Sequence, residues 1–315
     1  MTYRRPLSRV LGMSPESKGR PYRYTLFGTA VEAPAAAPGL YLVATPIGNL
    51  GDITLRALEL LAGANVIACE DTRVTRKLTQ RYGITTPLTP YHEHNSAEAR
   101  PKLLARLEDG QAVALLSDAG TPLISDPGYK LVRAACEAGH PVTALPGASA
   151  VLTALSVAGL PTDRFFFEGF LPSRQAARQR RIAALASIPA TLVLFETGPR
   201  IAATLADLTS AFGKRAAATC RELTKLHEEV KRADLETLAH EFAAGAETRG
   251  EFVIVIDPPA EDRQTIDSVD DLLRQALARV SVKDAVGEVA LATGRPRREV
   301  YQRALSLAKG PADED

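Results

Sequence analysis

Side chains that can exchange protons or hold ions gather at a few points of this 315-residue chain. These groups are Glu70-Asp-Thr-Arg73, His92-Glu-His94-Asn95, Glu196 with Arg200, and Arg221-Glu-Leu-Thr-Lys225. Such mixtures suit general acid–base work or the binding of a charged ligand. A plainer interpretation stays open for the first two groups, as a helix cap with a salt bridge and as exposed loop histidines. No metal site is expected at His92 and His94, because no further cysteine or histidine spacing completes one.

Three loops rich in glycine and proline are candidates for a ligand site. They are Thr45-Pro-Ile-Gly-Asn-Leu-Gly51, Ser117-Asp-Ala-Gly-Thr-Pro122 and Leu145-Pro-Gly-Ala-Ser-Ala150. Glycine lets the backbone turn sharply and approach a ligand, and Asp118 can accept hydrogen bonds from a ligand hydroxyl or amine. Neither the P-loop nor the dinucleotide-binding fingerprint is matched, which argues against an ATPase or a dehydrogenase. One such loop would be an ordinary turn, whereas three at one sheet edge favour a ligand site.

Alternating apolar runs and helical patterns predict an α/β fold that positions these loops. Strands are expected at 40–44, 66–69, 113–116 and 142–145, and helices at 54–62, 72–82, 129–138 and 148–158. This rhythm is typical of a mostly parallel sheet covered by helices on both faces. Ligands bind at the carboxyl ends of the strands in such sheets, which is where the three loops lie.

A second α/β unit and a short helical tail follow a boundary at 159–163. The second unit has strand candidates at 164–168, 191–196, 216–221 and 252–257, and helix candidates at 175–186, 200–212 and 234–244. The tail has three expected helices at 269–279, 282–292 and 297–308, with Thr293-Gly-Arg-Pro296 as the turn of a helix-turn-helix. The predicted domains are therefore a disordered basic leader at 1–38, α/β domains at 39–160 and 161–258, and a helical module at 267–309.

Charge and composition limit the partners and the cellular compartment that the sequence predicts. The net charge is only +1, so any nucleic-acid contact must come from local basic runs, which lie in the leader, at 174–181 and at 295–303. Three scattered cysteines are expected to be reduced thiols of a cytoplasmic protein. No run of about eighteen apolar residues exists, so no membrane span is expected, and no apolar stretch of a secretory signal follows the basic N-terminus.

Five segments together resemble the tetrapyrrole-methylase superfamily and, within it, the bacterial 16S ribosomal RNA cytidine-2′-O-methyltransferases. The segments lie at 43–52, 69–73, 116–128, 159–172 and 221–229, and the resemblance covers about 39–308. It implies two α/β domains with a cofactor cleft between them, plus a small C-terminal helical module. It also implies methyl transfer from S-adenosylmethionine to a cytidine ribose in the decoding centre of 16S ribosomal RNA within the 30S subunit, by a homodimer without a metal.

The resemblance also assigns roles to residues. It places the cofactor on Pro46, Ile47, Asp118, Ala119, Thr121, Ser149, Ala150, Phe195 and Glu196. The base is left open among Asp71, Glu70, His92, His94, Glu222 and Lys225; His92 has the most suitable ordinary pKa, about 6.5. Candidate RNA contacts are Arg73, Arg200 and Arg221, with Arg295, Arg297 and Arg298 in the helical module.

The chain departs from the family at two places. Thr197-Gly-Pro-Arg200 stands where relatives often have Ser-Pro-His-Arg, so no role of that histidine is carried over, and Ala148-Ser149 stands for Pro-Ser or Pro-Cys. Two other functions stay open: a methylase of corrin or porphyrin precursors, and a ribosome-assembly factor without catalysis. The basic C-terminal helices and the segment 221–225 argue against the first, and the intact loops argue against the second.

Overall fold

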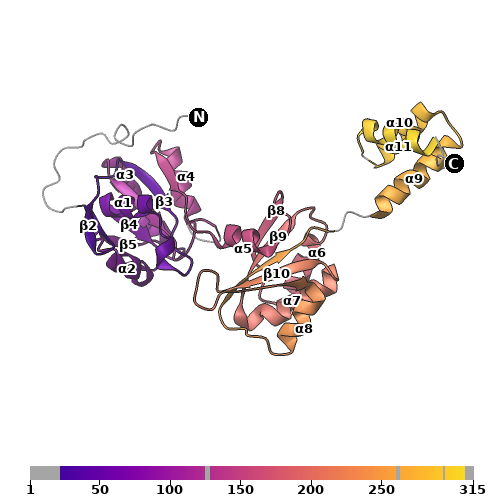
Figure 1. Ribbon diagram of the computed structural model, residues 1–315. Coiled ribbons are helices and arrows are strands. Elements are labelled where there is room, and N and C mark those ends of the chain that lie inside the picture. The colour runs from indigo at the N-terminus through magenta and orange to yellow at the C-terminus, as the bar shows by residue number, and fades with distance from the viewer. Residues whose placement is uncertain (1–21, 125–127, 260–262, 294, 309–315) are drawn as a thin grey trace. The chain divides into compact units, whose positions relative to one another are not determined.

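The computed structural model describes residues 22–124, 128–259, 263–293 and 295–308 (Figure 1). The chain divides into two compact units, residues up to 183 with 191–257, and residues 184–190 with those from 258 onward. The first unit carries both expected α/β domains. The second carries the three C-terminal helices, and each unit is described by itself.

The N-terminal domain is built on a parallel sheet of five strands in the order β5-β4-β6-β3-β7. The strands are β3 (Gly39–Val43), β4 (Val66–Cys69), β5 (Leu88–Pro90), β6 (Ala112–Leu116) and β7 (Val142–Leu145). Its helices are α1 (Leu55–Gly63), α2 (Thr72–Arg81), α3 (Ser96–Glu108) and α4 (Tyr129–Glu137). The four apolar runs expected as strands all form this sheet, and their carboxyl ends carry the three loops.

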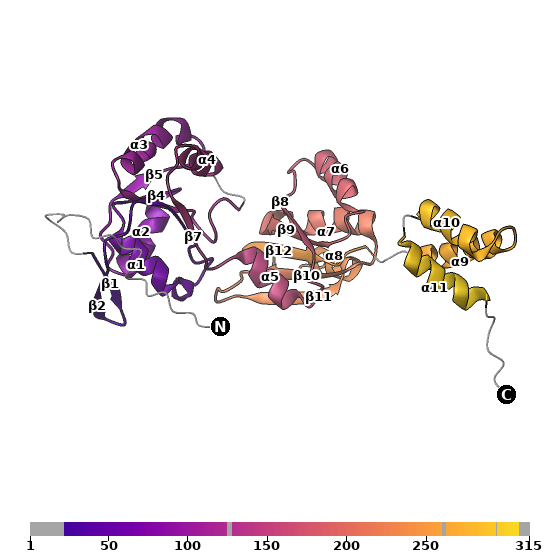
Figure 2. The ribbon, with the colours of Figure 1, turned by 90° about the horizontal axis from the view of Figure 1, so that it is seen from above.

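Alternate residues of each strand enter two separate cores. Ile67 and Ala114 face the core that α1 and α2 cover, whereas Val66 and Val113 face the core that α3 and α4 cover. The period of two follows from the pleat of a strand. Helices therefore lie on both faces of the sheet, α1 and α2 on one and α3 and α4 on the other (Figure 2).

The second domain has a mixed sheet in the order β11-β10-β12-β9-β8. Its strands are β8 (Phe165–Phe170), β9 (Thr191–Thr197), β10 (Ala216–Arg221), β11 (Glu229–Asp234) and β12 (Glu251–Ile256). Only β8 and β9 pair in parallel, and the other pairs are antiparallel. Helix α5 (Ala150–Ala158) packs on one face. The remaining helices are α6 (Gln175–Leu185), α7 (Gly198–Phe212) and α8 (Leu235–Ala243), and the ring of Phe242 in α8 meets Phe252 of β12.

Five elements were not expected from the sequence: β1, β2, β5, α3 and β11. The leader prediction is wrong for part of its length, because β1 (Arg23–Leu26) and β2 (Thr29–Glu32) form a hairpin whose Tyr24 is 8% exposed in the first core. Residues 1–21 lie outside the described residues. Helix α3 and strands β5 and β11 also lie where the sequence predicted neither helix nor strand. β11 reads Glu-Val-Lys-Arg-Ala-Asp, and such a charged edge strand has little of the apolar pattern that identifies strands.

The C-terminal unit is a three-helix module of α9 (Arg263–Leu277), α10 (Val282–Thr293) and α11 (Arg297–Ala308). Its core includes Val269, Leu273, Ala276, Val286, Val289, Ala290, Val300 and Ala304. Leu272 and Leu305 are 37% and 39% exposed. Arg303 and the buried Asp270 form a bidentate ion pair that ties α11 to α9.

No helix among the described residues is long and apolar enough to cross a membrane. The described part of the chain also has no group of three or more histidine, cysteine, aspartate or glutamate side chains arranged to hold a metal ion.

Candidate active site

A cavity of about 260 Å³ opens where loops of the two α/β domains face each other within the first unit. Its lining includes eight of the nine residues that the resemblance assigned to the cofactor: Ile47, Asp118, Ala119, Thr121, Ser149, Ala150, Phe195 and Glu196. Pro46 is the one that does not line it. The structure thus brings together residues separated by up to 149 positions in the sequence, Ile47 to Glu196.

Backbone hydrogen bonds fix the two N-terminal loops of this cavity against each other. Thr45 and Gly120 exchange N–H···O bonds of 2.9 and 3.0 Å, forming an isolated antiparallel bridge past the ends of β3 and β6. Gly120 has a φ of +75°, a backbone conformation that glycine adopts without strain. The Thr121 hydroxyl donates to the carbonyl of Ala148 at 3.3 Å, which connects the loop to the start of α5.

The cavity is acidic. Among the described residues, its charged lining consists of four carboxylates, Asp118, Glu196, Glu222 and Glu251, and one cation, Lys225. A phosphate-bearing cofactor would meet repulsion here, whereas a ligand with positive charge would be attracted. The lining therefore fits a sulfonium or ammonium ligand better than a nucleotide phosphate.

Asp118 has one carboxylate oxygen occupied and a perturbed pKa. Its Oδ1 accepts the backbone N–H of Asp71 at 3.0 Å, which orients the side chain. Burial is the largest influence on this carboxyl and raises its pKa above the usual range, assisted by the negative charge of Asp71. A carboxylate that is poorly solvated in this way gains from a cationic or hydrogen-bonding ligand.

Two phenylalanines, Phe170 and Phe195, line one side of the cavity, and a third, Phe167, packs against Phe195. The ring of Phe195 lies 4.9 Å from that of Phe167 and 5.6 Å from that of Phe170, both edge to face. Phe170 lines the cavity and is 53% exposed. The exposed ring of Phe170, packed against Phe195, offers a stacking surface for a flat ligand.

Glu196 is buried and fully engaged by the protein. Its carboxylate accepts the Thr197 N–H at 2.8 Å and the Thr204 hydroxyl at 2.7 Å, and it lies 3.2 Å from Arg200 Nε. Arg200 also donates to the carbonyl of Leu171 at 2.7 Å. Arg200 therefore neutralises a buried carboxylate and supports the wall of the cavity, and its guanidinium is not presented to a phosphate.

The loop after β10 brings Glu222 and Lys225 to the cavity. Lys225 Nζ donates to Glu222 at 2.8 Å and to Glu251 at 2.7 Å, and the Glu251 N–H donates to Glu222 at 2.9 Å. Burial acts to raise the pKa of Glu222, but the hydrogen bonds from Lys225 and the Glu251 amide outweigh it and lower that pKa. Glu222 has a φ of +50°, a conformation that is uncommon for residues other than glycine and is found at functional sites.

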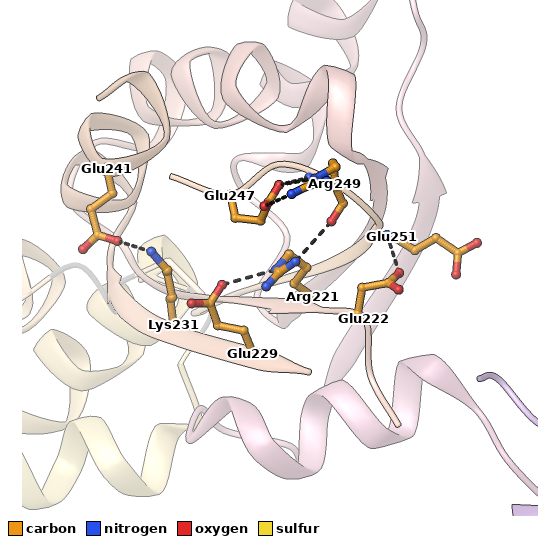
Figure 3. A network of polar contacts seen from close by, with 8 residues as sticks. All are labelled: Arg221, Glu222, Glu229, Lys231, Glu241, Glu247, Arg249 and Glu251. Atoms are coloured by element: carbon orange, nitrogen blue, oxygen red, sulfur yellow. Dashed lines mark hydrogen bonds and ion pairs between the residues drawn. The ribbon is translucent and has the colours of Figure 1, made fainter. Parts of the chain in front are cut away.

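A network of hydrogen bonds and ion pairs lies next to this loop (Figure 3). Arg221 pairs with Glu229 at 3.3 Å and donates to the carbonyl of Arg249, which itself pairs with Glu247. The Arg221 side chain is only 14% exposed. Like Arg200, this candidate phosphate contact is thus committed to protein partners, and the structure gives it a positioning role.

The remaining candidate catalytic residues lie outside the described lining of the cavity. Asp71 caps α2, accepting the Arg73 N–H at 2.8 Å, and pairs with the Arg73 guanidinium at 2.6 Å. The hydrogen bonds from Arg73 lower the pKa of Asp71 to about 2, so the cap-and-salt-bridge interpretation describes its geometry. Glu70 and His92 also lie outside the lining. His92 accepts no described hydrogen bond at its buried Nδ1 and packs 6.1 Å from the ring of His94.

The arginines of the C-terminal module lie at the start of α11, as expected. Arg297 and Arg298 are exposed, and Arg295 is partly buried in the turn before them. Arg73 is exposed as well, with 85% of its side chain accessible. Arg73, Arg297 and Arg298 are therefore the candidate RNA contacts that the structure presents to solvent.

Two family models and several curated relatives match this chain. Residues 39–239 match the family model described as Tetrapyrrole (Corrin/Porphyrin) Methylases, and residues 264–308 match the model of an RsmI C-terminal HTH domain. A Mesorhizobium japonicum protein named Ribosomal RNA small subunit methyltransferase I is 49% identical over 280 residues, which is 89% of this chain and 95% of the relative. A Micromonospora olivasterospora protein of the same name is 46% identical over 90% of this chain and 92% of its own length.

Solved structures share the fold at low identity. Diphthine synthase superposes with a TM-score of 0.55 at 19% identity, over 69% of this chain and 89% of its own. Uroporphyrin-III-C-methyltransferase from Thermus thermophilus gives 0.51 at 23% identity, over 70% and 94%. Except for Glu251, Phe252 and Val253, the lining of the cavity lies within residues 39–239, which match the methylase model.

Proposed function

The chain belongs to the tetrapyrrole (corrin/porphyrin) methylases, and we propose that it methylates the 2′-hydroxyl of a cytidine ribose in 16S ribosomal RNA. The coarser activity, methylation of small-subunit ribosomal RNA with S-adenosylmethionine, is supported by relatives named Ribosomal RNA small subunit methyltransferase I, which the chain matches over nearly their whole length. The observation that carries the proposal is the acidic cavity, whose lining contains eight of the nine expected cofactor residues.

The cavity fits the donor in charge and in shape. S-adenosylmethionine supplies a methyl group on a positively charged sulfur, which becomes a neutral thioether when the methyl group leaves. We assign Asp118 to its polar end, because one carboxylate oxygen is held by Asp71 and the other is free to accept a hydrogen bond. Small residues at the start of α5, Ser149 and Ala150, leave room for the adenosine, and Phe170 and Phe195 supply the apolar wall.

Glu222 and Lys225 are our candidates for the acceptor side. They line the same cavity as Asp118 and are fixed to each other and to Glu251. The lowered pKa makes Glu222 a weak base, so its carboxylate serves first to accept the hydrogen bond of the hydroxyl and align its oxygen. The proton then passes to Glu222 or to solvent as the new carbon–oxygen bond forms. A catalytic role stays a prediction for Asp71, Glu70 and His92, which do not line the cavity.

The C-terminal module is proposed to dock the ribosomal substrate. Exposed Arg297 and Arg298 lie at the start of α11, where backbone N–H groups also favour phosphate. The assembled 30S subunit as substrate, the homodimer and the cytoplasmic location are likewise expectations. Sedimentation of the purified chain would test the dimer.

Labelled S-adenosylmethionine incubated with undermethylated 30S subunits tests the function. We expect label in 16S RNA, at a cytidine whose ribose then resists alkaline cleavage and stops reverse transcription at low nucleotide concentration. The proposal would be refuted if the label were found on a base of the RNA. It would also be refuted if the RNA stayed unlabelled while a porphyrin precursor became labelled. Free 16S RNA serves as the comparison that shows whether the assembled subunit is needed.

A further inference from the structure

Helix α2 presents a continuous basic face, of which Arg73 alone was named above as a candidate RNA contact. Its exposed residues Arg73, Arg76, Lys77, Gln80 and Arg81 follow the spacing i, i+3, i+4, i+7 and i+8, which places them on one side of the helix. Thr75, Leu78 and Thr79 are buried on the opposite side. The helix itself contains no acidic residue.

This arrangement is unfavourable for the helix alone. Arg73 and Lys77, and Lys77 and Arg81, are like charges four residues apart, and each such pair weakens a helix slightly. Arg73 stands in the first turn, where the helix dipole disfavours a cation, and its ion pair with Asp71 offsets this effect. Among the described residues no ion pair is formed by Arg76, Lys77 or Arg81. The stripe is about 12 Å long at 1.5 Å per residue, enough for more than one phosphate.

The basic face begins at the cavity. Asp71, the cap of α2, donates its backbone N–H to Asp118, and Asp118 lines the cavity. The exposed face therefore leads away from the proposed methyl-transfer site, starting with Arg73. An RNA strand whose acceptor nucleotide reached the cavity would place its flanking phosphates near this helix.

The hairpin at the other end of α2 adds an aromatic residue. Thr25 of β1 donates its N–H to the carbonyl of Tyr82, the residue that ends α2, at 2.7 Å. The two-residue turn of the hairpin is Phe27-Gly28, with φ of 49° and 81°, and the Phe27 side chain is 98% exposed. Asparagine or aspartate is favoured at the first position of such a turn. A phenylalanine there adopts an uncommon backbone conformation and leaves its apolar ring exposed to water.

We propose that the basic face of α2 and the Phe27 hairpin form a second RNA-binding surface, the cations holding phosphates and the ring stacking on a base. The inference rests on the proposed function for the identity of the RNA, while its chemistry rests on charge and on the aromatic ring. Basic side chains combined with an exposed aromatic ring are the features by which proteins hold single-stranded nucleic acid irrespective of sequence. The hairpin lies outside both matched family models, so Phe27 would be an addition to the family's core.

Binding of the full-length chain to a mixed-sequence single-stranded RNA at several salt concentrations tests the surface. The variant R76A/K77A/R81A should lose about 2 units of log–log salt slope, since each phosphate contact to a single strand contributes about 0.7. At 0.1 M salt this corresponds to about a hundredfold weaker binding. Phe27→Ala should weaken binding by about tenfold and leave the slope unchanged, because stacking releases no counterions.

The matched control removes three cations from the opposite face of the same sheet. K102A/R106A/K130A changes exposed residues of α3 and α4, and should keep the wild-type slope. R76K/R81K keeps the charges and should restore binding. Unchanged S-adenosylmethionine affinity and melting temperature show that each variant is folded.

A wild-type salt slope in R76A/K77A/R81A, or an equal loss in the control, would overturn the proposal. Methylation of 30S subunits by the same proteins separates it from the proposed function. If the wild-type protein fails to methylate subunits, the proposed function fails, while the salt slopes still decide whether α2 binds RNA.

Discussion

Replacing Asp118 with asparagine tests the cofactor site at its most specific residue. Asparagine has nearly the same shape and keeps an oxygen for the Asp71 N–H, which Asp118 now accepts at 3.0 Å. The substitution therefore removes the negative charge and leaves the loop in place. Loss of one charge-assisted hydrogen bond costs about 1.5–3 kcal/mol, so the dissociation constant for S-adenosylmethionine should rise about 10- to 150-fold.

The same substitution should weaken cofactor binding without lowering the free energy of unfolding. Burial raises the pKa of Asp118, so the folded protein binds this proton more tightly than the unfolded chain does. The free energy of unfolding of the wild type therefore falls as the pH rises through the interval between the unfolded and the folded pKa. Asparagine does not ionise, so the variant should be at least as stable as the wild type at pH 7.

Calorimetric titration and thermal unfolding from pH 4 to 8 measure both effects. Wild-type affinity should decline as the pH falls through the raised pKa of Asp118, and the variant should lack that decline. Asp52→Asn is the matched control, because Asp52 is an exposed carboxylate outside the cavity lining of the proposed donor site. Unchanged affinity in Asp118→Asn would refute the assignment, and weaker binding with a lower melting temperature would show that the carboxylate supports the loop instead.

Three other substitutions separate the remaining roles. Glu222→Gln should lower the rate of methyl transfer by about a hundredfold, at the low end of general-base contributions, while S-adenosylmethionine affinity measured by titration stays within threefold. Asp207→Ala should lower the free energy of unfolding in urea by about 3–5 kcal/mol, because it leaves Arg178 buried without its partner at 2.7 Å. Ending the chain after Asp257 should preserve S-adenosylmethionine binding and sharply weaken methylation of 30S subunits, and normal turnover on subunits would remove the docking role of the C-terminal helices.

The part of the site that the sequence predicted is the part built on parallel strands. Each loop after β3, β6 and β7 was identifiable from an apolar run followed by glycine or proline. Parallel strands end at the same edge of a sheet, so loops that are distant in the sequence must converge there. Asp118 and Ser149 could therefore be placed at one site without knowledge of the tertiary contacts, and both line the cavity.

The arginines show where sequence reasoning failed. Arg200 and Arg221 follow strands in the same way as Asp118, and their charge suggested phosphate contacts. The structure buries most of both side chains and pairs them with Glu196 and Glu229. A cation needs a nearby acid to be neutralised inside a protein, and only tertiary contacts reveal whether that acid lies beside it. The basic face of α2 was missed because only Arg73 was considered as an RNA contact, and the other three cations were not recognised as lying on the same side of the helix.

The proposed acceptor side of the site depends on the antiparallel pairing of strands in the second sheet. Glu222 and Glu251 lie 29 positions apart, yet the antiparallel pairing of β10 with β12 sets Arg221 opposite Phe252 and so brings the two carboxylates together. Two neighbouring carboxylates repel each other, and Lys225 between them removes that repulsion by bonding to both. The proposed acceptor side therefore depends on strand register, and a one-residue slip of β12 would separate Glu251 from Lys225. Glu222 and Lys225 could be named as candidates from the sequence, whereas Glu251 could be added only from the folded chain, because long-range pairing of the strands brings it beside them.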